Sequence, residues 1–570
     1  MPFGGQNSNG GNRKKKIAII GTSALILVAM VVAVAVGFNR GEADNKSAAP
    51  ASPPPGVATT TKAVQAICQP TDYRETCEST LTSAAGNTSD PKELIKAAFN
   101  VTVDHISAAI RNSSTLKELA KDSRTNQALA NCDELLDYAI DDLKESFNRI
   151  GAFEYGKLDE YVNDLKIWLS GAITYEQTCL DGFENTTGEA GDRMKALLKS
   201  SQELTSNGLA MVTEISTILA SYNLPFNTSR RLLSEEDGEE GTPEWVSEGK
   251  RKLLAAGGRG INADVVVAKD GSGKYRTVNE ALKEIPKKGN RTFVIYIKQG
   301  IYKEQVMIDK SMTHVMFIGD GPTKTRITGS LNFVDGVQTF KTATVSVIGS
   351  NFIAKNIGFE NTAGPQKHQA VALRVQSDMA IFYNCHMDGY QDTLYTHTHR
   401  QFYRDCVISG TIDFIFGDAA AIFQNCKMVI RKPLENQNCI VTAQGRTDRR
   451  EATGLVLQNC VITGDPLYVP VKEKNKAYLG RPWKEYSRTI IMSSQIDGVI
   501  APEGWLPWAG DFALNTCFYS EISNRGPGAN QSGRVKWRGI KNVPPQRSSE
   551  FSLSRFLGEG WIKASGLPYV

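Results

Sequence analysis

The stretch FYNCHMDGYQDTLYTHTHRQFYRDCVISGTIDFIFGDAAAIFQNC, residues 382–426, contains one short pattern three times. Aromatic residues and an Asn or Asp precede a cysteine at Cys385, Cys406 and Cys426, and VLQNC repeats the end of the pattern at Cys460. The intervals are 21, 20 and 34 residues. Coils of a parallel β-helix take about 20 residues or more, so the repeat predicts stacked coils, one of them enlarged by a loop. The alternative, a β-sandwich, does not explain the recurring pair of Asn or Asp with Cys.

Two carboxylates occupy equivalent places in this repeat. Asp392 lies seven residues after Cys385, and Asp413 lies seven residues after Cys406. Strands of neighbouring coils stack about 4.8 Å apart, so the two acids are expected to lie almost in contact on one face. Repulsion and the aromatic surroundings then raise the pKa of one carboxyl group. The pair predicts one proton-bearing acid and one nucleophilic or basic carboxylate.

Polar and aromatic residues suited to ester chemistry accompany the pair. Gln391 directly precedes Asp392, and Gln369 lies 23 residues before Asp392, about one coil away. Amide side chains of this kind donate hydrogen bonds to a developing oxyanion. In LGRPW (479–483), Arg481 can hold a carboxylate through two hydrogen bonds, and Trp483 offers a flat surface for a sugar ring.

Two of the repeated cysteines are candidates for a disulfide. Cys406 and Cys426 share a register on adjacent coils. The spacing of the coils falls within the range of about 4.4–6.8 Å that a disulfide requires between its Cα atoms.

The segment from 63 to 224 has a helical pattern instead. PKELIKAAFNVTVDHISAAI and CDELLDYAIDDLKESFNRI repeat apolar residues at intervals of three and four, and two later segments do the same. Four such amphipathic segments predict an all-α four-helix bundle. Four of the ten cysteines, Cys68, Cys77, Cys132 and Cys179, belong to this part. Short β-rich runs replace the helical pattern from about 259 to 570.

The N-terminus predicts entry into the secretory pathway. A basic tail (1–16) ends in RKKK and is followed by 22 uncharged residues (17–38), which is the length of a membrane-spanning signal anchor rather than of a cleaved peptide core. The basic tail is expected to stay in the cytosol. A polar linker (39–62) follows, and eight N-x-S/T sequons and possible disulfides fit a secreted glycoprotein.

A processing linker is predicted at 225–258, between the helical and the β-rich parts. RRLL (230–233) and RKLL (251–254) flank an acidic run, so a protease is expected to cut at Arg230-Arg231 or at Arg251-Lys252. From Ala255 onward the chain has 39 Lys and Arg against 27 Asp and Glu, whereas the preceding part has 26 against 34. A basic half suits an anionic polymer, and the acidic part is able to cover it. Nucleic acid is excluded for a secreted chain.

Five motifs stand in the order typical of one enzyme family. They are GIYKE (300–304), QAVALR (369–374), GYQDTLY (389–395), DFIFG (413–417) and LGRPW (479–483). Together they resemble the signature segments of plant pectin methylesterases, and the helical part resembles the inhibitor-like pro-region of the longer plant forms. The resemblance implies a right-handed parallel β-helix (259–570) that hydrolyses the C6 methyl esters of cell-wall pectin without a cofactor or a metal.

The resemblance also implies a role for each matching residue. Asp413 is then the nucleophile, Asp392 the proton donor and Gln391 the stabiliser of the transition state, while Arg481 orients Asp413 and keeps it ionised. The residues expected to contact substrate are Thr339, Gln369, Arg481 and Trp483, with Trp505 as a further candidate for the cleft.

The family pairs the cysteines equivalent to Cys406 and Cys426. The inhibitor-like bundle (63–224) is expected to hold the disulfides Cys68–Cys77 and Cys132–Cys179, and to keep the enzyme silent until a subtilisin-like protease cuts the linker. The pairing of the other cysteines, Cys385, Cys439, Cys460 and Cys517, stays open.

Other functions remain as alternatives. Paired carboxylates on a β-helix also suit a pectin-cleaving glycosidase, although the NTD, GDD, GHG and RIK strings of polygalacturonases are missing. A pectate lyase needs a cluster of acids that binds Ca²⁺, and the paired Gln and Asp residues do not supply an obvious one. A serine esterase needs the motif G-x-S-x-G, which does not occur in the sequence. A non-catalytic pectin-binding or inhibitor protein is the alternative of another class. His397 and His399 have no third metal ligand beside them and are expected in a loop or on the surface.

Overall fold

A computed structural model describes residues 55–117, 120, 122–151, 158–214 and 262–569. The chain forms two compact units, which divide within the described residues after 101 and after 209. One unit holds 55–101 and 210–214, and the other holds 102–209 and 262–569. The predicted signal anchor (17–38) and both dibasic sites lie outside the described residues. Among the residues that are described, no helix is long and apolar enough to cross a membrane.

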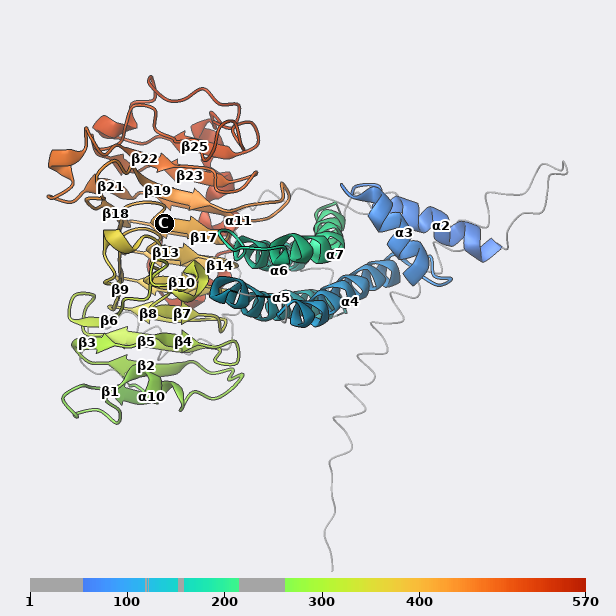
Figure 1. Cartoon of the computed structure of the whole chain (residues 1–570), viewed down its shortest axis with the longest axis horizontal. Helices are drawn as coiled ribbons and strands as arrows, with labels where there is room; N and C mark the ends of the chain where they lie inside the picture. The colour runs from blue at the N-terminus through green and yellow to red at the C-terminus, as the bar shows by residue number, and fades with distance from the viewer. Residues whose placement is uncertain (1–54, 118–119, 121, 152–157, 215–261, 570) are drawn as a thin grey trace, which may run out of the picture. The chain divides into compact units, whose positions relative to one another are not determined.

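The C-terminal region is a parallel β-helix built from three sheets, as the repeat predicted (Figure 1). A complete coil contributes one strand to each sheet, and the strand pairs within the sheets are parallel. The ten-stranded sheet contains β1 (Val265–Val267), β2 (Phe293–Ile297), β5 (Val315–Gly319), β8 (Ile353–Lys355), β11 (Ala380–Tyr383), β14 (Arg400–Arg404), β17 (Ala420–Gln424), β20 (Gly454–Gln458), β23 (Arg488–Met492) and β25 (Phe518–Ile522).

The other two sheets complete each coil. The eight-stranded sheet contains β3 (Gly300–Lys303), β6 (Thr325–Gly329), β9 (Gly358–Asn361), β12 (His386–Asp388), β15 (Val407–Gly410), β18 (Lys427–Ile430), β21 (Val461–Gly464) and β24 (Gln495–Ile496). The seven-stranded sheet contains β4 (Val306–Ile308), β7 (Val345–Val347), β10 (Leu373–Val375), β13 (Leu394–Thr396), β16 (Ile415–Gly417), β19 (Cys439–Gln444) and β22 (Ala477–Gly480). The short helix α10 (Val278–Leu282) lies between β1 and β2, and α11 (Leu553–Phe556) and α12 (Gly560–Ser565) follow the last strand.

The recurring Asn or Asp before each cysteine has a backbone cause. These residues form the turn between the ten-stranded and the eight-stranded sheets and have φ angles between 49° and 53°: Asn384, Asp405, Asn425 and Asn459. Asn and Asp tolerate this left-handed conformation better than other residues that carry a side chain. Side-chain amides add a ladder along the turn, since the Asn384 amide donates to Asn356 and the Asn459 amide to Asn425, each at 2.7 Å. The sequence repeat is therefore a repeat of one turn.

The interior of the coils is apolar and stacked. Phe382, Tyr403 and Phe423 lie above one another on β11, β14 and β17, with ring centroids 5.0 and 4.5 Å apart. All three rings are fully buried in one hydrophobic cluster that runs through the coils. Identical positions of a repeated coil therefore bury the same kind of side chain, which maintains the register of the strands.

The predicted disulfide between Cys406 and Cys426 is wrong for this structure, because both residues are free thiols. The two cysteines do lie on adjacent coils, and the Cys406 amide donates to the Cys426 sulfur at 3.4 Å. Each sulfur, however, makes the same contacts one coil apart: that of Cys406 lies 3.4 Å from the Phe382 carbonyl, and that of Cys426 lies 3.5 Å from the Tyr403 carbonyl. The side chains repeat in parallel, whereas a disulfide needs two sulfurs that turn toward each other.

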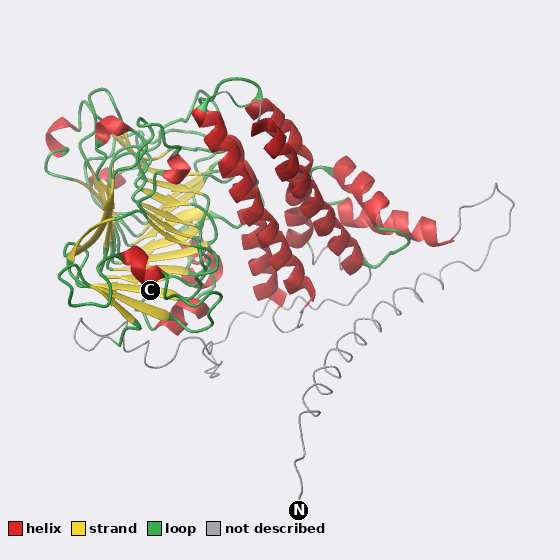
Figure 2. Ribbon diagram, turned by 60° about the horizontal axis from the view of Figure 1, so that its bottom comes forward, coloured by secondary structure: helices red, strands yellow, loops and turns green. Residues whose placement is uncertain are grey.

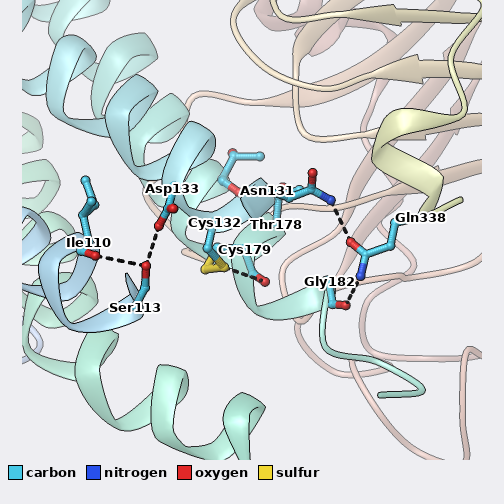
Figure 3. The surroundings of a disulfide bond; sticks show 10 residues. Ile110, Ser113, Asn131, Cys132, Asp133, Thr178, Cys179, Gly182 and Gln338 are labelled. Atoms are coloured by element: carbon cyan, nitrogen blue, oxygen red, sulfur yellow. Dashed lines mark hydrogen bonds between the residues drawn. A yellow bond between two sulfur atoms is a disulfide. The ribbon is translucent and has the colours of Figure 1, made fainter. Parts of the chain in front are cut away.

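The helical region of the larger unit contains four long helices in part or whole, shown in red in Figure 2. They are α4 (Pro91–Lys117), α5 (Ser123–Gly151), α6 (Leu158–Asp181) and α7 (Ala190–Thr213). The predicted disulfide Cys132–Cys179 is confirmed and joins α5 to α6 (Figure 3). Fully buried Leu135, Leu136 and Ala139 of α5 and Leu169 and Ala172 of α6 repeat at helical spacing, which explains the bundle.

The smaller unit contains α2 (Pro55–Cys68) and α3 (Arg74–Ala84). The predicted disulfide Cys68–Cys77 is confirmed, and it joins the end of α2 to α3. Both cysteines are buried.

Candidate active site

One cavity of about 270 Å³ collects the residues that the sequence singled out. From the β-helix it is lined by Thr339, Gln369, Gln391, Asp392, Asp413, Arg481 and Trp483, together with Trp508. These residues precede or follow strands of the seven-stranded sheet, so they form a row across its coils. From the helical region the cavity is lined by residues of α5 and α6 and of the loop after α6, among them Asn131, Thr178, Asp181, Gly182 and Glu184.

The register predicted for the two carboxylates is confirmed. Leu394 of β13 pairs with Ile415 of β16, and Asp392 and Asp413 each stand two residues before these partners. The Asp392 amide also donates to the Ile412 carbonyl at 3.0 Å, which joins the two turns.

Both acids have left-handed backbones, with φ angles of 62° for Asp392 and 50° for Asp413. Such conformations cost free energy and are common where a side chain must be aimed at a substrate. The turns therefore present both carboxylates at the same edge of the sheet.

Arg481 fixes the second carboxylate. Its Nε donates to Asp413 Oδ1 at 2.9 Å, and its Nη2 donates to Asp413 Oδ2 at 2.6 Å. The guanidinium carbon of Arg481 lies 4.2 Å from the ring centroid of Trp508, which stacks on its face. A bidentate pair of this kind is directional, so the arginine sets the orientation of the Asp413 carboxylate.

The electrostatic environment separates the two acids. Burial raises the pKa of Asp392 well above its ordinary value, the charge of Asp413 raises it further, and Arg481 opposes both effects. Burial also raises the pKa of Asp413, but the charge of Arg481 and its hydrogen bonds to Asp413 lower that pKa and oppose the effect of burial. The surroundings therefore favour a proton on Asp392 more strongly than on Asp413, whose carboxylate Arg481 stabilises.

Trp483 is positioned by its neighbours across two coils. Its ring meets Phe416 edge-on at a centroid distance of 5.9 Å. A Cβ atom at position 445 would lie 2.9 Å from the Trp483 ring, so only glycine leaves room for the ring there. The aromatic face is thus held beside the carboxylates by packing rather than by hydrogen bonds.

The expectation that Trp505 lies in the cleft requires correction. Trp505 does not line the cavity: it is 1% exposed, stacks on Tyr519 at 4.3 Å and donates to Glu521 at 3.3 Å. Trp508, three residues later, lies in the cavity instead, and only its position in an aromatic-rich loop could have suggested it. His397 and His399 lie in the loop between β13 and β14, as one of the two expectations had it, and they are fully or almost fully buried there rather than on the surface.

Helices α5 and α6 contact the β-helix within the larger unit, and this contact explains the buried histidines. The Thr178 hydroxyl is 2.9 Å from His397 Nε2, and Asp142 Oδ2 is 2.8 Å from His399 Nε2. The Thr174 hydroxyl donates to Asp418 at 2.7 Å. Nothing in the sequence indicates which face of the coils the helices contact.

A glutamine beside the cavity connects the two regions most closely. The Asn131 amide donates to Gln338 Oε1 at 2.7 Å, and Gln338 Nε2 donates to the Gly182 carbonyl at 2.8 Å (Figure 3). Gln338 also donates to the Arg124 carbonyl at 3.0 Å. Gln338 and the neighbouring Thr339 both line the cavity, so these bonds lie at one end of the row.

Ion pairs surround this contact. The acids come from α5 and α6, and their partners come from the β-helix: Glu134 with Lys341, Asp141 with Lys310, Asp142 with His399, Asp164 with Arg400, and Asp181 with Lys484. Arg400 is also held by Asp378 of the β-helix at 2.6 Å. The distribution follows the charge difference between the two halves of the sequence.

No group of three or more residues of the types that bind metal ions is assembled within the described ranges.

The sequence matches two family models. The one described as Pectinesterase covers residues 264–560, and the one described as Plant invertase/pectin methylesterase inhibitor covers residues 62–211. An Arabidopsis thaliana protein named "Putative pectinesterase/pectinesterase inhibitor 28" is 54% identical and matches over 99% of this chain and 76% of its own. "Probable pectinesterase/pectinesterase inhibitor 58" of the same plant is 53% identical over 98% of each chain. The solved "Pectin methylesterase from Carrot" is 48% identical, with a TM-score of 0.54, and covers 54% of this chain and 98% of that chain.

Proposed function

The chain belongs to the pectinesterase family, and we propose that it removes the C6 methyl esters of homogalacturonan through an acyl-enzyme on Asp413. The products are methanol and a more acidic pectin. The observation that carries the assignment is the unequal carboxylate pair, in which Arg481 binds Asp413 while Asp392 has the more strongly raised pKa.

The first half of the reaction forms the acyl-enzyme. Ionised Asp413 attacks the ester carbonyl, and the side-chain amide of Gln391, assisted by Gln369, donates to the oxyanion of the tetrahedral intermediate. The intermediate collapses with cleavage of the bond to the methoxyl oxygen, and Asp392 gives its proton to the departing methanol.

The second half returns the enzyme to its starting state. Asp392, now ionised, takes a proton from a water molecule, which attacks the acyl carbon. Cleavage of the bond to Asp413 releases the galacturonate and restores a protonated Asp392 beside an ionised Asp413. Thr339 and Trp483 contact the sugar chain on either side of the carboxylates.

The test uses Asp413→Ala and Asp413→Asn. Both variants should lose methanol release while still binding pectin, because the nucleophile is removed and the rest of the row remains. A reducing-end assay on the parent protein separates esterase from glycosidase action, and new reducing ends without methanol would refute the proposal. Unchanged methanol release from the variants would refute the mechanism.

The helical region acts as an inhibitory pro-region of this enzyme, and the contacts of α5 and α6 at the cavity support how it does so. We propose that it blocks the row of substrate-binding residues until a subtilisin-like protease cuts at Arg230-Arg231 or Arg251-Lys252. Replacing all four basic residues with alanine should yield a secreted protein that stays silent. Full activity from the uncut protein would overturn this role.

The remaining proposals concern the route of the chain. We propose that the precursor enters the secretory pathway through the segment 17–38 as a membrane anchor, is glycosylated at its sequons and reaches the cell wall after processing. N-terminal sequencing of the secreted protein determines the cut site and the fate of the anchor together. A mature protein that begins directly after residue 38 would identify a cleaved signal instead.

A further inference from the structure

We propose that Lys484 binds the carboxylate of an already de-esterified galacturonate next to the ester under attack, and so makes partly de-esterified pectin the preferred substrate. This inference rests on the proposed function and adds a specificity-determining residue to it. The sequence motif ends at Trp483, and none of the roles described above includes the lysine that follows.

Lys484 is placed at the end of the substrate row. Its Nζ lies 4.8 Å from the ring centroid of Trp483, which lines the cavity. Trp483 follows β22 and Thr339 precedes β7. These two strands lie toward opposite ends of the seven-stranded sheet, so the two residues mark opposite ends of the row. A sugar chain that runs along the row across Trp483 therefore passes the ammonium group of Lys484.

The structure already places a carboxylate at this ammonium group. Asp181 Oδ1, at the end of α6, lies 2.5 Å from Lys484 Nζ, and Asp181 also lines the cavity. The two side chains are only 14% and 16% exposed, so the pair is shielded from water. Glu184, another acid of the cavity, is close enough for the charge of Lys484 to lower its pKa, although burial raises that pKa overall.

The β-helix supplies no anion of its own here. Among the described residues from 262 to 569, none forms an ion pair with Lys484, whereas Arg481, three residues earlier in the chain, is held by Asp413. When the helical region leaves, Lys484 loses the carboxylate of Asp181 and retains the face of Trp483. A galacturonate carboxylate in the same place restores the pair, and the flexible, point-like charge of lysine suits an anion whose orientation varies along a polymer.

The inference has a direct consequence for the reaction. The product of one turnover is a galacturonate with a free carboxylate, which is the group that Lys484 attracts. The next ester of the same chain is then presented to Asp413 more often than an ester flanked by other esters. Lys484 therefore favours contiguous rather than scattered de-esterification. In the precursor, Asp181 occupies the place of this product carboxylate.

The experiment compares two substrates with the fragment 259–570, the part that the solved carrot enzyme represents by itself at 98% coverage. Methanol release is measured on fully methylated and on half-methylated homogalacturonan. Lys484→Gln should lower the ratio of kcat/KM for the half-methylated over the fully methylated polymer about tenfold, the usual loss for a charge-assisted hydrogen bond. Lys484→Arg, which keeps the charge, should retain most of the preference.

Lys427→Gln provides the matched control, because Lys427 is an exposed residue of β18 in the eight-stranded sheet, away from the cavity. It should leave the ratio unchanged. An equal ratio for Lys484→Gln and the parent, or the same loss in Lys427→Gln, would overturn the inference while leaving the esterase assignment intact. A parent fragment that releases no methanol from either polymer would instead refute the proposed function.

Discussion

Arg481 binds both carboxylate oxygens of Asp413, with Nε 2.9 Å from Oδ1 and Nη2 2.6 Å from Oδ2. Asp392 occupies the equivalent position one coil away, where burial and the charge of Asp413 raise its pKa. Two chemically identical side chains thus have different electrostatic surroundings because one arginine is bound to one of them. This asymmetry supports the proposed roles of Asp413 as nucleophile and Asp392 as acid.

Replacing Arg481 with lysine tests this asymmetry. A single ammonium group cannot bind both oxygens, so the pKa of Asp413 should rise further above its ordinary value. Activity requires ionised Asp413, so the acidic limb of the profile of kcat/KM against pH should move to higher pH, and kcat should fall about 100-fold. An unshifted acidic limb would show that another group keeps Asp413 ionised.

Gln391 is expected to act on the transition state alone. Gln391→Ala should lower kcat about 100- to 1,000-fold, as removal of one oxyanion donor does, with little change in KM. Gln366→Ala is the control, because Gln366 is exposed in the turn Pro365–Lys367, and it should leave kcat and KM unchanged. A change confined to KM would assign Gln391 to ground-state binding instead.

The register of the coils could be predicted from the sequence because a repeated turn leaves a repeated residue. Asn384 and Asp405 mark the same left-handed turn on two successive coils. Asp392 follows Asn384 by eight residues, and Asp413 follows Asp405 by the same number. Counting residues therefore places the two acids together. The same reasoning failed for Cys406 and Cys426, because register fixes the backbone but not the direction in which a sulfur turns.

What contacts the outside of the coils could not be predicted in this way. His397 and His399 are polar residues of the loop between β13 and β14, and they resemble surface residues until α5 and α6 are packed against them. Trp505 and Trp508 are three residues apart in one loop, and only the fold shows that the first is in the core and the second in the cavity. Spacing carries information about contacts within the repeat and little about contacts between separate parts of the chain.

Trp508 is predicted to position Arg481. Its ring is stacked on the guanidinium group at 4.2 Å, so Trp508→Leu removes a cation–π contact and frees the arginine to turn. We expect kcat to fall about tenfold, a loss of the size that one cation–π contact accounts for, while Trp508→Phe retains most of the activity. The thermal stability should change little, because the ring is only partly buried. A Trp508→Leu enzyme with a higher KM and the parent kcat would identify a substrate contact instead.

The contact between His399 and Asp142 makes the pro-region sensitive to pH. His399 Nδ1 lies 2.6 Å from the Gln376 carbonyl, which only accepts, and Nε2 lies 2.8 Å from the Asp142 carboxylate, so both ring nitrogens donate and the ring is charged. Burial lowers the pKa of His399, but the charge and hydrogen bond of Asp142 outweigh it and raise the pKa overall. The groups that face this pair are Lys310, Asp378, Arg400, Asp164 and the neighbouring His397.

The sign follows from linkage. A group whose pKa is raised in the closed state stabilises that state fully below its free value of about 6.5, and this contribution is lost as the pH rises through the raised pKa. The ratio of methanol release by the uncut full chain to that by the fragment 259–570 should therefore increase from about pH 6 to pH 9. Taking the ratio cancels the titration of Asp392 and Asp413, which both proteins share. His399→Gln, which donates to Asp142 without titrating, should flatten the increase, whereas Lys310→Gln, which leaves the pair of His399 and Asp142 in place, should preserve it. A ratio that is constant with pH, or that increases equally in His399→Gln, would show that this ion pair does not govern the release of the pro-region.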